Sequence, residues 1–146
     1  MLRLCPGDNL GVRYGLGTSL LKAKRYSDAL VFAQTWMAHQ GDPNPPRGGC
    51  IFLDKDFIPP KPEPLSKAQC QKLTRNKFMS AAFPYTAALA AFRLWGDKQG
   101  EEAEKGRKLA EQYLVVAAEL NSYVMLKVLG KIDQPSKCVS GRVNPL

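Results

Sequence analysis

The sequence predicts an all-α protein. Apolar residues recur at spacings of three and four on both sides of a proline-rich stretch, and this is the period of an amphipathic helix. The alternation of apolar and polar residues that is typical of half-buried strands is scarce throughout. A chain of 146 residues, 45% of them hydrophobic, is long enough to bury a core of its own. We therefore expect one helical domain over residues 1–146.

Residues 8–40 are predicted to form a first pair of helices. Asp8 follows Cys-Pro-Gly and is the expected N-cap of the first helix. The apolar pattern weakens at residues 22–25 and restarts at Tyr26. Gly15 and Gly17 would each cost roughly 1 kcal/mol inside a helix, and the usual compensation is the close approach of another helix. Two antiparallel helices with a short turn fit these features better than one long rod.

Residues 41–64 form a proline-rich insertion between the helices. Seven of the 11 prolines of the chain lie here, and the Pro-Pro pairs exclude a helix and favour an extended chain. An apolar island at residues 50–58 can dock on the helical body and pin the insertion.

The remaining helices are expected within residues 65–130, followed by a tail at residues 131–146. A third helix is expected to start at Ser66, and an alanine-rich fourth helix to start at Ser80 or Pro84 and to end at Gly96. Residues 98–121 are expected to form a longer helix whose start is frayed near Gly100 and Gly106. Residues 122–130 are expected to form a short helix that ends at Gly130. We expect little order in the tail.

The first helix pair resembles a tetratricopeptide repeat. Leu16-Gly17, Tyr26, Ala29 and residues 30–33 fall at the offsets of that motif. The resemblance implies that Gly17 and Ala29 let the two helices approach closely. A second, degenerate copy resembles the motif less closely. Its matching residues are Tyr85, Ala88, Leu89, Phe92, Gly96, Ala110, Leu114 and Ala117.

A narrower resemblance rests on the segments "LRLCPGDNLGVRYGL", "LWGD" and "YVMLKVLGK". They are similar to a group of fungal proteins that combine tetratricopeptide-like helices with, in some members, a MYND-type zinc finger. The clustered Cys and His ligands of that finger are missing from this chain. The helical part of these proteins usually lies within a longer chain, so the resemblance leaves open whether this sequence is a fragment or a shortened member.

The tetratricopeptide resemblance implies an interaction module that binds a partner protein or peptide and needs no cofactor. The implied groove-facing positions are Tyr14, Thr18, Lys22, Thr86 and Arg93. The Lys and Asn that clamp a C-terminal carboxylate in some family members are absent at the matching positions. A helical stack normally needs about three repeats to bury its faces, so a homo-oligomer is also compatible with the sequence.

A formal net charge of +8 and a pI near 9.5 favour acidic partners, and they support a second hypothesis of RNA or DNA binding. The basic positions form two clusters that would have to converge. They are Lys22, Lys24 and Arg25, and Lys67, Lys72, Arg75 and Lys77. Tyr26 and Phe78 lie near these clusters and can stack on bases.

Catalysis is the least supported hypothesis. No nucleophile motif, phosphate-binding glycine loop or dinucleotide fingerprint is present. Asp54 and Asp56 are the best pair of carboxylates for a metal-dependent ribonuclease. The four cysteines, at positions 5, 50, 70 and 138, form no Cys-x-x-Cys pair and the only histidine is His39, so we expect no metal site.

The sequence also predicts an intracellular protein, cytoplasmic or nuclear, without a membrane span. The start lacks the apolar region of a secretory signal. The most apolar stretch, residues 81–92, is shorter than the roughly 20 residues that a span needs, and it contains Pro84 and ends at Arg93.

Overall fold

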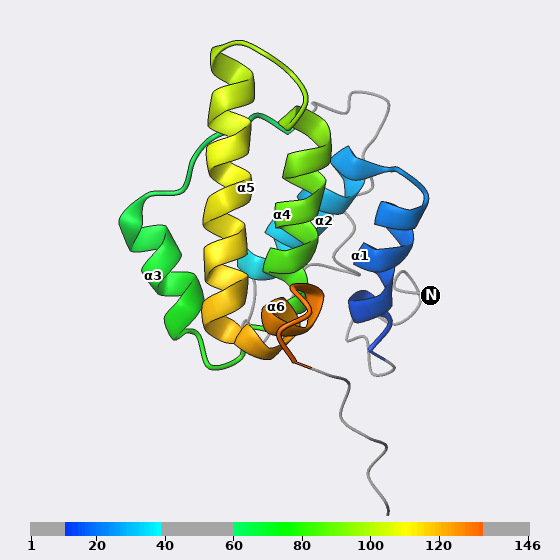
Figure 1. The fold of residues 1–146 in the computed structure, drawn as a ribbon, viewed down its shortest axis with the longest axis vertical. Helices are drawn as coiled ribbons and strands as arrows, with labels where there is room; N and C mark the ends of the chain where they lie inside the picture. Colours follow the sequence, from blue (N-terminus) through cyan, green and yellow to red (C-terminus); the bar gives the residue numbers. More distant parts are fainter. Residues whose placement is uncertain (1–10, 39–59, 133–146) are drawn as a thin grey trace, which may run out of the picture.

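The computed structural model describes residues 11–38 and 60–132, and within these ranges every regular element is a helix (Figure 1). The all-α prediction is therefore confirmed for this part of the chain. The helices are α1 (Val12–Lys22), α2 (Tyr26–Ala38), α3 (Lys67–Arg75), α4 (Ala82–Trp95), α5 (Glu101–Leu120) and α6 (Ser122–Val128).

The basic break in the first segment is a turn between two helices, as predicted. Lys24 adopts a left-handed conformation with φ 57°, and its N–H donates to the carbonyl of Leu21 while that of Arg25 donates to Leu20. This pair of bonds is a Schellman motif, which satisfies the last carbonyls of α1. The start of α1 differs from the expectation, because Gly11, with φ 65°, occupies the N-cap position. The expected cap, Asp8, lies outside the described residues.

Gly17 lets α1 approach α4, whereas the prediction placed its close contact against Ala29 of α2. A Cβ atom added to Gly17 would meet the side chain of Thr86 on α4 at 2.9 Å. Ala29 is fully buried in the common core. The small residue is therefore needed for a contact between helices that are far apart in the sequence.

Helix α4 lies at the centre of the fold. It packs along α5 on one side and against α2 on another, α1 rests on α2 and α4, and α3 packs on α5 (Figure 1). The core between α2 and α4 is aromatic, since Trp36 stacks on Phe83 with a centroid separation of 6.2 Å and Phe32 meets both rings edge-on. Alanines that line the buried side of α4 allow this close packing. They are Ala87, Ala90 and Ala91.

The chain that leads into α3 is fastened to α5. The backbone N–H of Leu65 donates to the side-chain amide of Gln112, and that amide donates back to the carbonyl of Leu65, at 2.7 and 2.8 Å. Ser66 then caps α3 as predicted, in a reciprocal capping box with Gln69. Residues 60–66 contain no helix. The rest of the insertion, with its apolar island at residues 50–58, lies outside the described residues.

The expected fraying of α5 at two glycines is wrong for one of them. Gly100, with φ 99°, precedes the first residue of α5, so it marks the start of the helix. Gly106, by contrast, is buried inside the helix, and its missing side chain makes room for Trp95 of α4. Helix α4 begins at Ala82, between the two expected entry residues, and it ends at the predicted Gly96.

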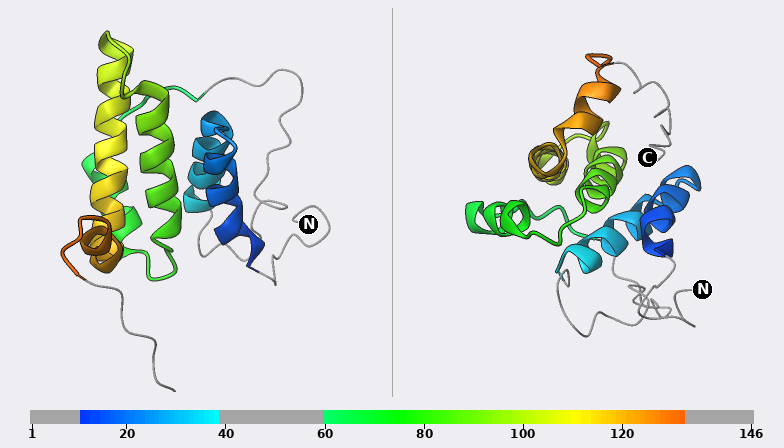
Figure 2. Two further views of the ribbon diagram at one scale, coloured as in Figure 1. Left: turned by 45° about the vertical axis from the view of Figure 1, so that its right-hand side comes forward. Right: turned by 90° about the horizontal axis from the view of Figure 1, so that it is seen from below.

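Helix α6 ends as predicted at a capping glycine. Gly130 has φ 65°, and the N–H of Lys131 donates to the carbonyl of Leu126 at 2.8 Å, which is again the Schellman pattern. Figure 2 shows that α6 projects from the end of the α4–α5 pair rather than lying flat along it. Most of the predicted tail, from residue 133 onward, lies outside the described residues.

Candidate functional site

A largely apolar groove runs between α4 and α5 on the side of the pair from which α6 projects. Its volume is about 540 Å³. The lining residues are Tyr85, Ala88, Leu89 and Phe92 of α4, Arg107, Ala110, Glu111 and Leu114 of α5, and Val124 of α6. We call this hollow the α4–α5 groove.

The groove is hollow because small residues meet where the two helices touch. Ala88 and Ala110 are 7% and 6% exposed and lie along the contact between α4 and α5. Leu89, Phe92 and Leu114 stand on either side, each between 44% and 51% exposed. The α4 residues follow the spacing i, i+3, i+4 and i+7 from Tyr85, so they form one stripe along the helix.

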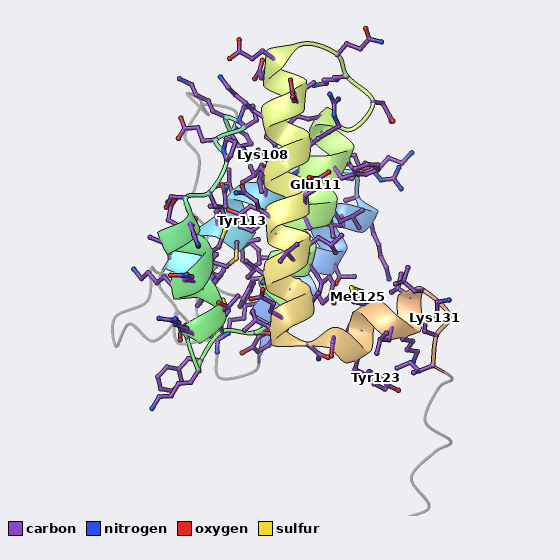
Figure 3. All side chains as sticks on the ribbon, turned by 60° about the vertical axis from the view of Figure 1, so that its left-hand side comes forward. Lys108, Glu111, Tyr113, Tyr123, Met125 and Lys131 are labelled. Atoms are coloured by element: carbon purple, nitrogen blue, oxygen red, sulfur yellow. The ribbon has the colours of Figure 1, made fainter. Side chains whose placement is uncertain are left out.

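The polar groups of the groove lie at its ends and rim. At the α5 start, the guanidinium of Arg107 donates to the carbonyl of Lys98 at 2.8 Å, which closes the α4–α5 loop onto the helix. At the other end, the hydroxyl of Tyr85 donates to the carbonyl of Asn121 at 3.1 Å, at the junction where α6 begins. Glu111 projects from the side of α5 opposite to Tyr113 (Figure 3). Among the described residues, the lining contains no Ser, Cys or His, and most of its side chains offer apolar contacts.

Exposed large apolar residues concentrate on the three helices that line this groove. Of the ten large hydrophobic residues that are exposed in the described part of the chain, eight lie on α4, α5 and α6 or at the end of α6. They are Leu89, Phe92, Leu114, Val115, Tyr123, Val124, Val128 and Leu129. A patch of this kind on a folded protein commonly marks a surface that another molecule covers.

The positions implied by the tetratricopeptide resemblance lie outside the α4–α5 groove. Tyr14, Thr18 and Lys22 lie exposed along α1, and Arg93 is exposed on α4, but none of them lines the α4–α5 groove. Thr86 is only 8% exposed, because it fills the contact with Gly17 and its hydroxyl donates to the carbonyl of Ala82. Thr86 is thus a packing residue between helices rather than a position open to a partner.

The two basic clusters proposed for nucleic acid do not come together. Lys24 and Arg25 lie in the α1–α2 turn, and Arg25 forms an ion pair with Asp28 at 2.6 Å. The other cluster is on α3 and just after it, at Lys67, Lys72, Arg75 and Lys77. Figures 1 and 2 place α3 and the α1–α2 turn on opposite sides of the α4–α5 pair. The described residues therefore do not build one continuous basic surface from both clusters.

Most of the residues considered for catalysis or metal binding lie outside the described part of the chain. They are Asp54, Asp56, His39, Cys5, Cys50 and Cys138. Cys70 is a free, half-buried thiol on α3. Within residues 11–38 and 60–132, no group of three or more His, Cys, Asp or Glu side chains is placed to hold a metal ion.

Tyr113 is a buried tyrosine of α5. It is 3% exposed, and its hydroxyl accepts a hydrogen bond of 3.2 Å from the side-chain amide of Gln34. Burial raises the pKa of Tyr113 above its usual value, the hydrogen bond from Gln34 opposes that rise, and nearby Cys70 adds to it. It borders a separate, more polar hollow of about 340 Å³ between α2, α3 and α5, which Lys72 also lines.

Reasoning from the sequence missed the groove residues as a site, although it placed several of them in the second repeat-like copy. The signal was present in α4, which has a single charged residue, Arg93, among its 14 positions. A helix that is apolar around most of its circumference needs cover on more than one side. Helix α6, with sequence SYVMLKV, carries the same signal.

Comparisons with known proteins place this chain in no family. No protein-family model matches it, and no curated protein or solved structure shows significant similarity to it. In the described ranges, no helix combines the length and the apolar character that crossing a membrane requires.

Proposed function

We propose that this chain is a protein–protein interaction module that binds an α-helical segment of its partner in the α4–α5 groove. The single observation that carries the proposal is an apolar groove bordered by exposed large side chains on two rigid, tightly packed helices. Pockets that bind ligands are typically concave and mainly apolar, with few polar groups.

The dimensions of the groove favour a helix as the bound element. From Tyr85 to Phe92 the axis of α4 rises by about 10 Å, which equals two helical turns and also the diameter of one helix with its side chains. An amphipathic helix that presents apolar residues at i, i+3, i+4 and i+7 matches such a stripe. Ala88 and Ala110 leave depth for these side chains, while Leu89 and Leu114 flank them.

A tetratricopeptide-like scaffold is part of the same proposal. Tyr26 begins α2, Gly17 and Ala29 are buried, and the α4–α5 pair repeats the succession of two helices joined by a short connection. In stacked repeats, each helix pair buries the apolar face of its neighbour. The α1–α2 pair covers one face of α4, and the α4–α5 groove lies on a face that no later pair covers within the described residues.

The test uses a fluorescein-labelled synthetic amphipathic helix with Leu at i, i+3, i+4 and i+7 and Glu or Lys elsewhere. Fluorescence anisotropy should show saturable binding to the wild-type chain. Leu89→Glu places a charge in the groove and should weaken binding about 10-fold or more, since truncating a central hot-spot residue typically costs about 2 kcal/mol or more and about 1.4 kcal/mol corresponds to a factor of 10. Phe78→Glu is the matched control, because Phe78 is 62% exposed and lies outside the groove.

Equal binding by the wild type and Leu89→Glu would contradict the proposal, and so would a wild-type chain that binds no helix. A labelled generic RNA, titrated across a salt series, addresses the nucleic-acid alternative. Tight binding of RNA with a steep salt dependence would favour that alternative over the groove.

A further inference from the structure

Helix α6 is an exposed apolar helix beside the groove. Five of its seven residues are Tyr, Val, Met or Leu, and none of the seven is buried. Val128 is 81% exposed and Leu129, which follows the helix, is 59% exposed. An isolated helix of this length is only marginally stable in water, and most helical stability comes from the packing of an apolar face. Within residues 11–38 and 60–132, the apolar side chains of α6 are therefore left without a helix that covers them.

The placement of α6 makes the chain complementary to itself. Figures 2 and 3 show α6 projecting at a steep angle from the end of α5, so that it and the α4–α5 pair form an open corner. Val124 faces into this corner, because it lines the groove, and Val128 lies one turn further along the same face of α6. Met125 points toward the body and Tyr123 away from it (Figure 3). A projecting apolar helix thus lies beside an apolar groove whose extent along α4 is about one helix diameter.

We infer that the partner of the groove is a second copy of this chain, with α6 of each copy bound in the α4–α5 groove of the other. The inference rests on the proposed function and names its partner. In a dimer with a twofold axis both contacts form at once, because α6 of the first copy meets the groove of the second and α6 of the second copy meets the groove of the first. A foreign helix would fill the groove but leave α6 uncovered, whereas a second copy covers both.

The exposed apolar area is sufficient for such a dimer. Seven exposed apolar residues of α4, α5 and α6 and of the end of α6 leave roughly 60 to 120 Å² exposed each, and together on the order of 600 Å² per chain. They are Leu89, Phe92, Leu114, Val115, Val124, Val128 and Leu129. A standard interface buries about 800 Å² on each partner, and smaller interfaces are typical of weak or transient complexes. We therefore expect a reversible dimer rather than a permanent one.

A carboxylate on the groove rim also has charges opposite to it on α6. Residues 122–132 contain Lys127 and Lys131 and no acidic residue, so α6 and its end are basic. The groove presents the carboxylate of Glu111 on its α5 rim, and the guanidinium of Arg107 is held at the start of α5 by its hydrogen bond to the carbonyl of Lys98. Opposite charges at the rim steer association and fix the register of docking.

Sedimentation velocity of the full chain over a series of protein concentrations tests the inference. The wild type should shift from monomer to dimer as the concentration rises. Val128→Glu on α6 and Leu89→Glu in the groove should each weaken association about 10-fold or more, while Phe78→Glu should behave as the wild type. An equimolar mixture of the first two variants should associate more strongly than either alone, because it rebuilds one intact contact between α6 and the groove.

The outcomes separate this inference from the proposed function. A wild type that stays monomeric at every concentration, or a dimer that neither variant weakens, would overturn the inference. The Val128→Glu chain keeps an intact groove, so its binding of the labelled synthetic helix reports on the proposed function alone. Peptide binding by a chain that never dimerises would leave a foreign helical partner. The absence of peptide binding to Val128→Glu would refute the groove itself.

Discussion

Replacing Gly106 by alanine should destabilise the protein, although the same replacement usually stabilises a helix. Gly106 lies inside α5, where alanine is favoured over glycine by about 0.5–1 kcal/mol. A Cβ atom at this position would, however, lie 2.5 Å from the Cβ and Cδ2 atoms of Trp95 and closer still to its Cγ. Optimal contacts between carbon atoms are about 3.5–4.0 Å, so the added atom is short of room by about 1 Å.

Trp95 cannot move aside cheaply. It is 6% exposed, so its ring has little room to rotate, and one of the clashing atoms is its Cβ, whose position is fixed by the backbone of α4. The replacement therefore forces α4 and α5 apart, and overpacking of this kind costs about 1–3 kcal/mol. After the gain in helix propensity is subtracted, we expect the free energy of unfolding to fall by about 1–2 kcal/mol. The spreading should also widen the α4–α5 groove, because Arg107 and Ala110 follow on the same helix.

Gly15 provides the matched control. It lies inside α1, and a Cβ atom added there meets nothing within 4 Å. Gly15→Ala should therefore raise the free energy of unfolding by about 0.5–1 kcal/mol. Urea unfolding followed by circular dichroism measures both variants. Changes of the same sign at the two positions would refute the argument that the contact with Trp95, rather than helix propensity, decides the outcome.

Three further predictions follow from single side chains. Lys24→Gly should stabilise the α1–α2 turn by up to about 1 kcal/mol in thermal or urea unfolding, because Lys24 holds a left-handed conformation that costs a non-glycine residue about 1–2 kcal/mol. Ser66→Ala should cost about 1 kcal/mol by removing the capping bond to Gln69, and Ser66→Asn or Ser66→Asp should recover most of it. Tyr113→Phe should cost about 0.5–1.5 kcal/mol at neutral pH through the lost hydrogen bond with Gln34. Because folding raises the pKa of Tyr113, the tyrosine contributes its full stability below the usual pKa of about 10 and loses this contribution as the pH rises through the pKa of the folded state. Over that alkaline range the wild type should therefore lose more stability than Tyr113→Phe.

Local signals in the sequence predicted the helices well. The basic break after Lys22, the serine at position 66 and the glycine at position 130 each act within one turn of the chain, through hydrogen bonds to nearby backbone groups. Interactions of such short range are readable without knowledge of the tertiary fold. The break between α1 and α2 was correctly identified for this reason, whereas the N-cap at Asp8 was not, since α1 begins after Gly11.

The contacts between distant elements could not be predicted in the same way. A small residue shows that something approaches closely, but not which helix does so. The sequence predicts a contact of Gly17 with α2, its neighbour along the chain, yet its contact is with Thr86, 69 positions later. The sequence likewise predicts a frayed start of α5 at Gly106, because a glycine alone does not reveal the tryptophan that occupies the space beside it.

The candidate site depends on how the apolar surface of α4 is shared among its neighbours. Helix α4 uses its alanines and Phe83 against α2 and α5, and this leaves Leu89 and Phe92 on the remaining side. Helix periodicity shows that all these residues are apolar, but it does not show how many helices surround α4. Within the described residues α2, α5 and α1 supply three of those neighbours, and Val124 of α6 lines the groove on the fourth side. Leu89 and Phe92 on that side are therefore apolar but exposed among the described residues. A helix supplied by another molecule would bury them.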